Sequence, residues 1–477
     1  MSRIALQASH VIGFNGRSHV IWRNGEVVFS GNTILHVGQH FSGEVDQRID
    51  YGSAVIGPGF IDLDALGDLD STVLCFDNAD DWELGRLWRE GDTSRPETYT
   101  PEEELFKYRY AFTQLIRNGI TTALPIAPGR NHAAAESYEE FAGVAAIAAD
   151  LGLRTYLGPC YMSGTTTTDE HGSTGQYWDE DRGLKGLAEA ERFIADFDNT
   201  GGGLIRAILA PDRIETCTPG LLEGTSRIAR DTGVPVRIHC CQSRYEVELV
   251  RRLRGKTSYR WLDSLGLLNV QAILPHGIHA HDDDVALLAA SGASIAHCPV
   301  VFARDGEALN SFASYQARGV NIGMGTDTFP PDMIDNMRQG LNICRVVEGR
   351  RDASSAADFY TAATLNGAKA LRRDDIGRLS AGAKADITVF DLSGFHLGPF
   401  IDPVKTMVLA GSGRDFIDSW IDGRRVMQDR QPADQSLEAL RQTGDRQFVK
   451  LMASHQARSP RRQPPDELFK PSFPLAS

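Results

Sequence analysis

Between residues 54 and 324, short apolar runs of strand length alternate with amphipathic segments of helical length, such as 102–117, 137–151 and 283–291. Strands separated by helices pair in parallel, and eight such units predict a (β/α)8 barrel, an α/β fold. An open, doubly wound sheet is the alternative, but no glycine-rich turn of the dinucleotide-binding type follows the first strand. The expected strands are 54–57, 121–126, 154–158, 203–209, 234–239, 272–276, 293–297 and 320–324.

Both ends of the chain return to short strands. Residues 19–22 and 26–30 flank Asn24-Gly25, a pair that predicts a hairpin turn, and Asp422-Gly423 predicts another between 418–421 and 425–427. We also expect strands at 385–391 and 406–410. Because the N-terminal strands would be marginally stable alone, we predict that both ends form one small β-sandwich into which the barrel is inserted.

These patterns divide the chain into four parts. The expected boundaries are 1–57 and 376–430 for the two parts of the sandwich, 58–375 for the barrel, and 431–477 for a C-terminal helix and an irregular tail.

Composition excludes several classes of protein. The 477 residues carry 49 Lys+Arg and 63 Asp+Glu, a formal charge of −14, which argues against binding to nucleic acid or to an anionic membrane. No apolar run reaches the 18 residues of a membrane span, and the N-terminus lacks the pattern of a signal peptide. The 7 cysteines are an odd, scattered set, as expected of free thiols in a reducing compartment. We therefore expect a cytoplasmic protein of enzyme size.

Four metal-binding or proton-transferring side chains end successive strands of the predicted barrel. His239, His276 and His297 each end an apolar run, and Asp327 ends Gly-Met-Gly-Thr-Asp. Because all strand ends of a (β/α)8 barrel converge on one cup, these side chains are expected to share a site. Imidazole nitrogens and a carboxylate suit Zn²⁺ or Fe²⁺ better than Ca²⁺ or Mg²⁺.

Several motifs resemble the amidohydrolase superfamily, and within it the branch of cytosine, guanine and S-adenosylhomocysteine deaminases and triazine hydrolases. The resemblance runs in order from residue 24 to residue 430. It implies the sandwich-plus-barrel architecture and a single metal ion that activates water for attack on a C–N or C–Cl carbon. The motifs are Pro58-Gly-Phe-Ile-Asp62, Gly119-Ile-Thr-Thr122, Val236-Arg-Ile-His239, Leu274-Pro-His276, Ala296-His-Cys-Pro299, Gly325-Thr-Asp327, Ala363-Thr-Leu-Asn-Gly-Ala368, Gly377-Arg-Leu-Ser-Ala-Gly-Ala-Lys-Ala-Asp386 and Ile421-Asp-Gly-Arg-Arg-Val426.

The chain departs from that family at three positions. Where the resemblance implies a His-x-His pair of ligands on the first strand, the sequence has Asp64 and Leu66, and where it implies a proton-shuttling Glu, the sequence has Gln242. Leucine cannot bind a metal, and an amide cannot act as a general base, although it can orient a substrate or a water. By the logic of the family, His239 and Asp327 remain as ligands.

His276 then remains to polarise the leaving group or bind the attacking water, and its ordinary pKa near 6.5 makes it the expected proton carrier. Three hypotheses stay open. In the first, a weaker metal site is formed by Asp64, His239 and Asp327, joined or not by His276. In the second, His276 and Asp327 perform acid–base chemistry without a metal. In the third, the protein is a non-catalytic relative that binds a ligand.

The function that follows is a hydrolase acting on a C–N bond of a small, polar, nitrogen-rich substrate. The expected catalytic residues are His276, Asp327 and Gln242, with His297, Arg213 and Trp88 as substrate contacts. One divalent Zn or Fe ion is the expected cofactor, no organic cofactor is expected, and homodimerisation is an expectation of the resemblance alone.

Overall fold

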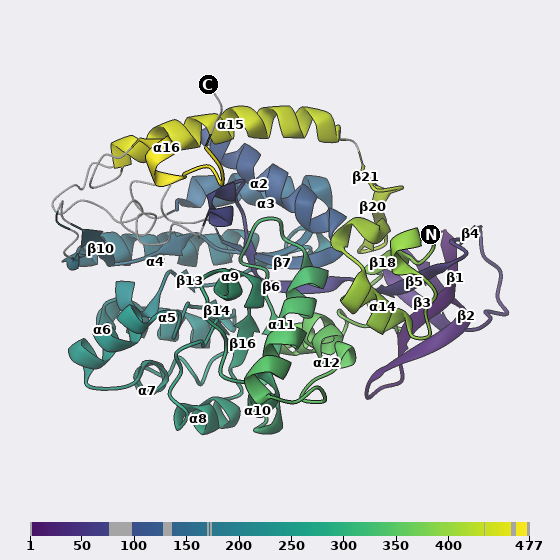
Figure 1. Cartoon of the computed structure of the whole chain (residues 1–477), viewed down its shortest axis with the longest axis horizontal. Coiled ribbons are helices and arrows are strands. Elements are labelled where there is room, and N and C mark those ends of the chain that lie inside the picture. The colour runs from purple at the N-terminus through teal and green to yellow at the C-terminus, as the bar shows by residue number, and fades with distance from the viewer. Residues whose placement is uncertain are drawn as a thin grey trace.

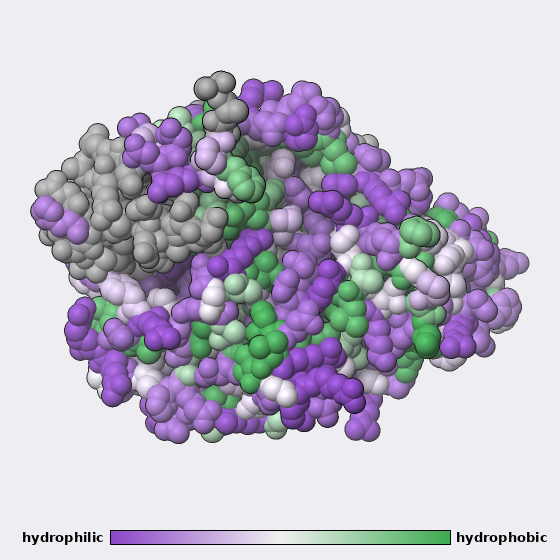
Figure 2. Space-filling model, viewed as in Figure 1, coloured by the Kyte–Doolittle hydropathy of each residue, from purple (hydrophilic) through white to green (hydrophobic). Residues whose placement is uncertain are grey.

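The computed structural model describes residues 2–75, 98–126, 136–168, 171, 174–433, 435–458 and 464–474. Strands from both ends of the chain lie together at one end of the molecule, and a barrel surrounded by helices occupies the rest (Figure 1). The long helix α15 (Leu437–Arg458) lies across the barrel helices (Figure 1). On the face shown in Figure 2, hydrophobic side chains form small, separate groups among hydrophilic ones. No helix within the described ranges is long and apolar enough to cross a membrane.

Eight strands form two parallel four-stranded sheets, in the orders β12-β8-β7-β6 and β14-β15-β16-β17. A parallel bridge between Leu209 and Val236 joins the sheets on one side. On the other side, the Asp327 N–H donates to the Asp64 carbonyl at 2.8 Å, so the eighth strand end lies beside the first. The strands thus follow the circular order of the predicted (β/α)8 barrel. They are β6 (Phe60–Leu66), β7 (Ile120–Ile126), β8 (Arg154–Leu157), β12 (Ile205–Ala207), β14 (Val236–Arg237), β15 (Ala272–Pro275), β16 (Ser294–His297) and β17 (Asn321–Met324).

The outer helices follow local sequence signals. Helix α2 begins after Thr100, which forms a capping box with Glu103, and helices α3 and α5 end at Gly152 and Gly233, both with positive φ. Their apolar faces pack on the strands in the main hydrophobic core. The outer helices are α2 (Pro101–Arg117), α3 (Tyr138–Leu151), α4 (Glu180–Phe197), α5 (Pro219–Thr232), α6 (Arg244–Arg254), α7 (Ser258–Ser264), α8 (Asp284–Ser291), α9 (Pro299–Arg304), α10 (Phe312–Ala317) and α11 (Met333–Glu348).

Helices after α11 close the end of the barrel opposite the strand ends. The side chains of Ile61, Leu63 and Ile273 inside the barrel share a hydrophobic cluster with Ala368 and Leu371 beneath it. The segments are α12 (Ala356–Thr361), the π-helical turn η5 (Ala362–Asn366) and α13 (Gly367–Ala370). Because this end is packed shut, the open cup lies at the carboxyl ends of the strands.

The strands at the two chain ends form one nine-stranded sheet. The pairing that joins the ends is antiparallel, between β5 and β18, with Ile387 opposite Pro58 and Asp391 opposite Ala54. The strands are β1 (Arg3–Phe14), β2 (His19–Ser30), β3 (Thr33–Gly38), β4 (Gln47–Asp50), β5 (Ala54–Pro58), β18 (Ile387–Asp391), β19 (Phe416–Ile421), β20 (Arg424–Gln428) and β21 (Gln431–Pro432). The predicted turn at Asp422-Gly423 is present, with positive φ at both residues.

A buried ion pair fixes this sheet to the barrel. Arg154, at the start of β8, has no exposed side-chain surface. Its Nε and Nη2 donate to the two Asp386 carboxylate oxygens at 2.9 and 3.1 Å, and Nη2 also donates to Asp422 Oδ1 at 3.1 Å. The guanidinium is thereby satisfied by carboxylates that lie next to β18 and β19.

Three expectations from the sequence are wrong. Residues 54–57 lie in β5 of the nine-stranded sheet, and the first barrel strand is 60–66, because β5 finds partners on both edges in β1 and β18. Asn24-Gly25 makes no hairpin: β2 runs through it and keeps one register with β1 on both sides, with Ala8 opposite Gly25 and His10 opposite Arg23, although Asn24 has a positive φ. Residues 406–410 are helical, in α14 (Pro403–Ala410), because Asp402 caps that helix and Pro403 occupies its first turn.

The remaining described elements lie along the mouth and the outer surface of the barrel. Strands β10 (Gly164–Thr168) and β11 (Thr174–Trp178) pair as an antiparallel hairpin in the insertion after the third barrel strand. The short strands β9 (Cys160–Tyr161) and β13 (Ala210–Pro211) extend the third and fourth barrel strands and pair in parallel. Helix α16 (Pro465–Leu468) contacts α15 near the C-terminus.

Candidate active site

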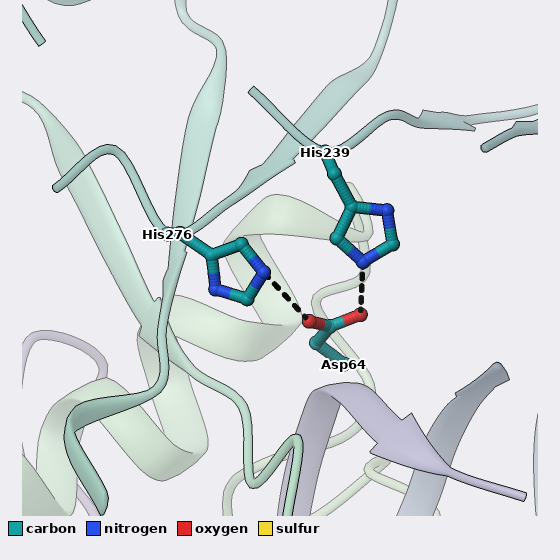
Figure 3. A group of neighbouring side chains, drawn as sticks. All are labelled: Asp64, His239 and His276. Carbon is teal, nitrogen blue, oxygen red and sulfur yellow. Dashed lines mark ion pairs between the residues drawn. The ribbon is translucent and has the colours of Figure 1, made fainter. Parts of the chain in front are cut away.

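Asp64, His239 and His276 meet at the carboxyl ends of β6, β14 and β15 (Figure 3). His239 Nε2 lies 3.7 Å from Asp64 Oδ1, and His276 Nε2 lies 3.9 Å from Asp64 Oδ2. One ligand atom from each residue lies within 4.8 Å of the other two, and all three residues are buried. Three strand ends therefore converge on one point, as expected from the sequence.

Hydrogen bonds orient this group. His239 Nδ1 lies 2.6 Å from the Asp212 carbonyl oxygen, and because a carbonyl can only accept, Nδ1 carries the proton and Nε2 presents a lone pair to Asp64. Asp64 Oδ1 and both ring nitrogens of His276 are buried with no hydrogen-bond partner among the described residues. Buried polar atoms without partners occur elsewhere in the chain too, but these lie together at one point, which suits the binding of a ligand.

Asp327 supplies a fourth group. Its Oδ2 lies 3.7 Å from His276 Nε2, and its side chain is 13% exposed, which makes it the more accessible of the two carboxylates. Both His276 and Asp327 have a positive φ, a conformation that costs free energy for residues other than glycine. The backbone strain at the ends of β15 and β17 therefore coincides with the two side chains that face each other across the cup.

Burial sets the protonation of this group. It lowers the pKa of His239, with contributions from the positive charges of Arg213 and Arg237, and it lowers the pKa of His276 well below the usual value, with His239 and Arg213 adding to the effect. Burial and the neighbouring Asp327 raise the pKa of Asp64. Both imidazoles are therefore neutral at pH 7, which is the form that binds a metal.

Arg237 is a member of the site that the sequence analysis missed. Its Nη1 donates to the carbonyls of Leu124 and Pro125 at 3.0 and 3.2 Å and lies 3.9 Å from Asp64 Oδ1. The side chain is 4% exposed, so a fixed positive charge lies inside the barrel beside Asp64. A signal was present: Arg237 precedes His239 by two residues, and alternation along a strand places such a pair on one face.

The group fits a divalent ion of the zinc type. Tetrahedral zinc with ligand bonds of about 2.0–2.2 Å holds its ligand atoms about 3.4 Å apart, so the three ligand atoms, which lie within 4.8 Å of one another, would move closer together around an ion. Two imidazole nitrogens with one carboxylate suit Zn²⁺ or Fe²⁺. Asp327 is placed to act as a fourth ligand or as a proton acceptor.

A second group of metal-capable side chains, Cys240, Cys241 and Glu246, lies directly after His239. The Glu246 carboxylate is engaged by the backbone N–H groups of Cys241 and Gln242 at 2.8 and 2.6 Å and by the hydroxyl of Ser258. Burial raises the pKa of both thiols, which keeps them protonated and poor ligands. Glu246 thus anchors the turn that carries Gln242.

Gln242 and Arg213 are two further residues that the sequence placed in the site. Gln242 is half-buried, and its Oε1 has no hydrogen-bond partner in the described part of the chain. Arg213 lies next to Asp212 and is close enough to His239 and His276 to lower the pKa of both.

His297 is not a member of the Asp64 group, although its charge is close enough to lower the pKa of His276. The His297 ring contacts Phe312 of α10 and Phe359 of α12, in the helical layer around the barrel. Trp88 lies outside the described residues.

The fold and the convergent group at its strand ends define a protein class. The chain belongs to the amidohydrolase family, whose sequence profile matches residues 56–426. As a member of that family it is a hydrolase that acts on carbon–nitrogen bonds other than peptide bonds.

One relative with a similar sequence and two proteins with similar structures have known names. The chain is 28% identical over 437 residues to a 5-methylthioadenosine/S-adenosylhomocysteine deaminase of Natronomonas pharaonis, covering 90% of this chain and 95% of the relative. Its structure resembles a zinc-containing adenosine deaminase from Xanthomonas campestris, with a TM-score of 0.76, 21% identity and coverage of 94% and 98% of the two chains. It also resembles a zinc complex of the atrazine chlorohydrolase from Arthrobacter aurescens, with a TM-score of 0.76, 19% identity and coverage of 93% and 100%.

Proposed function

We propose that this protein is a deaminase that releases an amino group as ammonia from a small nitrogen-rich substrate, with one Zn²⁺ or Fe²⁺ ion held by Asp64, His239 and His276. The observation that carries the proposal is the convergence of three ligand atoms within 4.8 Å, two of whose side chains have buried atoms without partners. The similarity to a deaminase over 90% of the chain supports loss of ammonia rather than of chloride.

The sequence predicted Asp64, His239 and Asp327 as ligands, joined or not by His276; the proposed set takes in His276 and leaves Asp327 beside the group. Asp327 is then available for proton transfer. When bound, the ion would supply a Lewis acid between the two histidines.

The chain's own residues account for the movement of protons. The Asp327 carboxylate accepts a proton from the attacking water and returns it to the leaving amine, so that water and the amino compound become the hydroxy or keto product and ammonia. Asp327 takes this role because Gln242 cannot accept a proton, and because Asp327 is the cup carboxylate with exposed surface. Gln242 orients the substrate through its amide, and His239, locked by the Asp212 carbonyl, keeps its orientation throughout.

The position of Arg237 supports an alternative mechanism in which no metal takes part. Its guanidinium lies 3.9 Å from Asp64 Oδ1 and supplies a positive charge beside that carboxylate without any metal. In this case His276 and Asp327, whose Nε2 and Oδ2 atoms are 3.7 Å apart, perform the acid–base chemistry alone.

The test combines metal content with ammonia release. The protein is stripped with a chelator, reloaded with zinc or ferrous iron, and assayed on a panel of aminopurines, aminopyrimidines and aminotriazines. We expect about one ion per chain, activity only after reloading, and loss of both in Asp64→Asn. The matched control is Asp68→Asn, because Asp68 is also buried but accepts hydrogen bonds from the Leu69 and Asp70 backbone.

The outcomes separate the hypotheses. Full activity in the stripped protein would favour the metal-free mechanism. Normal metal content in Asp64→Asn would remove Asp64 from the ligand set. A protein that binds members of the panel but never releases ammonia would be a non-catalytic relative.

A further inference from the structure

A cavity of about 780 Å³ lies between the C-terminal end of α2, the start of α11 and strands β19 and β20. None of Asp64, His239, His276 and Asp327 lines it. Its volume falls in the range of pockets that bind small molecules, about 300–1,000 Å³. The proposed deaminase chemistry does not use this cavity.

Arginine dominates the charged lining. Five arginines and two aspartates line the cavity, a formal local charge of +3, whereas the whole chain carries −14. The arginines are Arg117, Arg304, Arg338, Arg414 and Arg430. Such a reversal of sign within one concave space attracts anions from solution.

Several of these charges already have partners in the protein. Asp332 caps α11 and accepts from the backbone N–H groups of Ile334 and Gly413. Arg430 Nη2 pairs with Asp391 Oδ2 at 3.1 Å. Arg338 donates to the backbone carbonyls of Val408 and Gly411, which end α14. These groups hold the walls of the cavity in place.

Arg117 and Arg414 are different. Within the described ranges, neither guanidinium forms an ion pair, and Arg117 donates only a 3.4 Å hydrogen bond, to the Arg430 carbonyl. Burial lowers the pKa of Arg117, and the positive charge of Arg414 lowers it further. Both arginines line the same cavity, Arg117 half-buried and Arg414 exposed, and most of their N–H donors make no hydrogen bond within the described residues, so together they can hold an anion that carries more than one charge.

We propose that this cavity binds a small phosphate compound, with Arg117 and Arg414 on the phosphate group. Phosphate carries nearly two negative charges at neutral pH and accepts paired hydrogen bonds from guanidinium groups, whereas a monocarboxylate would neutralise only one of the two arginines. The rest of the cavity has room for a nucleoside or for further phosphates. A nucleotide and an inorganic phosphate or polyphosphate share this chemistry.

Calorimetric titration of the full-length protein at constant ionic strength tests the proposal. The probes are inorganic phosphate, pyrophosphate, ATP, adenosine and acetate. We expect saturable binding of at least one phosphate compound, and no binding of acetate. Binding of ATP alone would identify the source as a nucleotide, and equal binding of pyrophosphate would identify it as inorganic. Adenosine controls for binding in the Asp64 cup.

Variants locate the binding. Arg414→Gln and Arg117→Gln should each weaken phosphate binding by about tenfold or more, the loss expected for one charge-assisted contact. Arg252→Gln, an exposed arginine on α6 without an ion pair among the described residues, should leave it unchanged. Thermal unfolding of each variant verifies that it is folded.

The proposal is overturned if no phosphate compound binds at millimolar concentration, if acetate binds as well, or if Arg252→Gln weakens binding as much as Arg414→Gln. A change of oligomeric state in Arg414→Gln without any phosphate binding would assign the arginines to a contact between copies of the chain, and would overturn it too. Deaminase activity is not the readout, so this test is independent of the proposed function.

Discussion

The substitution Arg237→Gln should increase the affinity of the Asp64 site for Zn²⁺. Arg237 is a fixed cation inside the barrel, 3.9 Å from the carboxylate to which the ion would bind. Its positive charge opposes a dication at that position. Glutamine keeps an N–H₂ group that can donate to the Leu124 and Pro125 carbonyls, which the arginine holds at 3.0 and 3.2 Å.

The magnitude follows from the distance between Arg237 and Asp64. At an effective dielectric constant of about 20, unit charges 3.9 Å apart interact by about 4 kcal/mol, so Arg237 favours the ionised form of Asp64 by up to that amount. An ion about 2 Å from the Asp64 oxygen lies within about 6 Å of the guanidinium and is repelled by about 5 kcal/mol or more. The repulsion exceeds the benefit of an ionised Asp64 by about 1 kcal/mol, so the affinity should rise by about fivefold.

The assay is competition for zinc against a chromophoric chelator at pH 7.5. Arg237→Lys is the matched control, because it keeps the charge and should bind zinc as weakly as the native protein. The reasoning would be refuted if Arg237→Gln bound zinc no more tightly than Arg237→Lys, with both variants folded by circular dichroism.

Three further predictions concern activity and stability. His276→Asn removes a proposed metal ligand and should lower ammonia release by about 10²-fold or more, and because burial lowers the pKa of His276, protonation of this ligand should reduce the native rate only below pH 6.5. Arg154→Met leaves Asp386 buried without its cation and should cost about 3–5 kcal/mol in urea unfolding. Burial lowers the pKa of His19 to about 4, so the unfolded chain binds the extra proton first as pH falls below 6.5, and His19 should contribute a loss of about 2–3 kcal/mol to the stability of the native protein by pH 4.5, a contribution that His19→Gln removes.

The barrel could be predicted because its signal is a long periodic pattern. Each of the seven strand candidates from 121–126 to 320–324 contains or overlaps an observed strand, since alternation of strands and helices leaves few architectures open. The convergence of parallel strand ends predicted that His239 and His276 meet, but the same argument also placed His297 in the group, and Asp64 was found only through the family resemblance.

The errors arose where the outcome depends on a distant partner. The pair Asn24-Gly25 has the chemistry of a turn, but the twelve residues of β1 offer a continuous partner that keeps β2 extended. The run 406–410 is an exception, because the deciding signal was local: the run is apolar enough for a strand, but Asp402, four residues upstream, caps a helix. Arg237 escaped notice because its importance depends on Asp64, which lies far away in the sequence.

The pairing of β5 with β18 also determines when this protein can finish folding on the ribosome. Arg154 and Asp386 are 232 positions apart, so the ribosome must synthesise the rest of the barrel before the Arg154 guanidinium can pair with the Asp386 carboxylate. Until β18 and β19 leave the exit tunnel, the nascent chain presents the open edge of β5 to chaperones and to other chains. Shortened versions of the protein that end before Ile421 should therefore aggregate, whereas removal of the segment after Pro432 leaves every strand of the nine-stranded sheet in place.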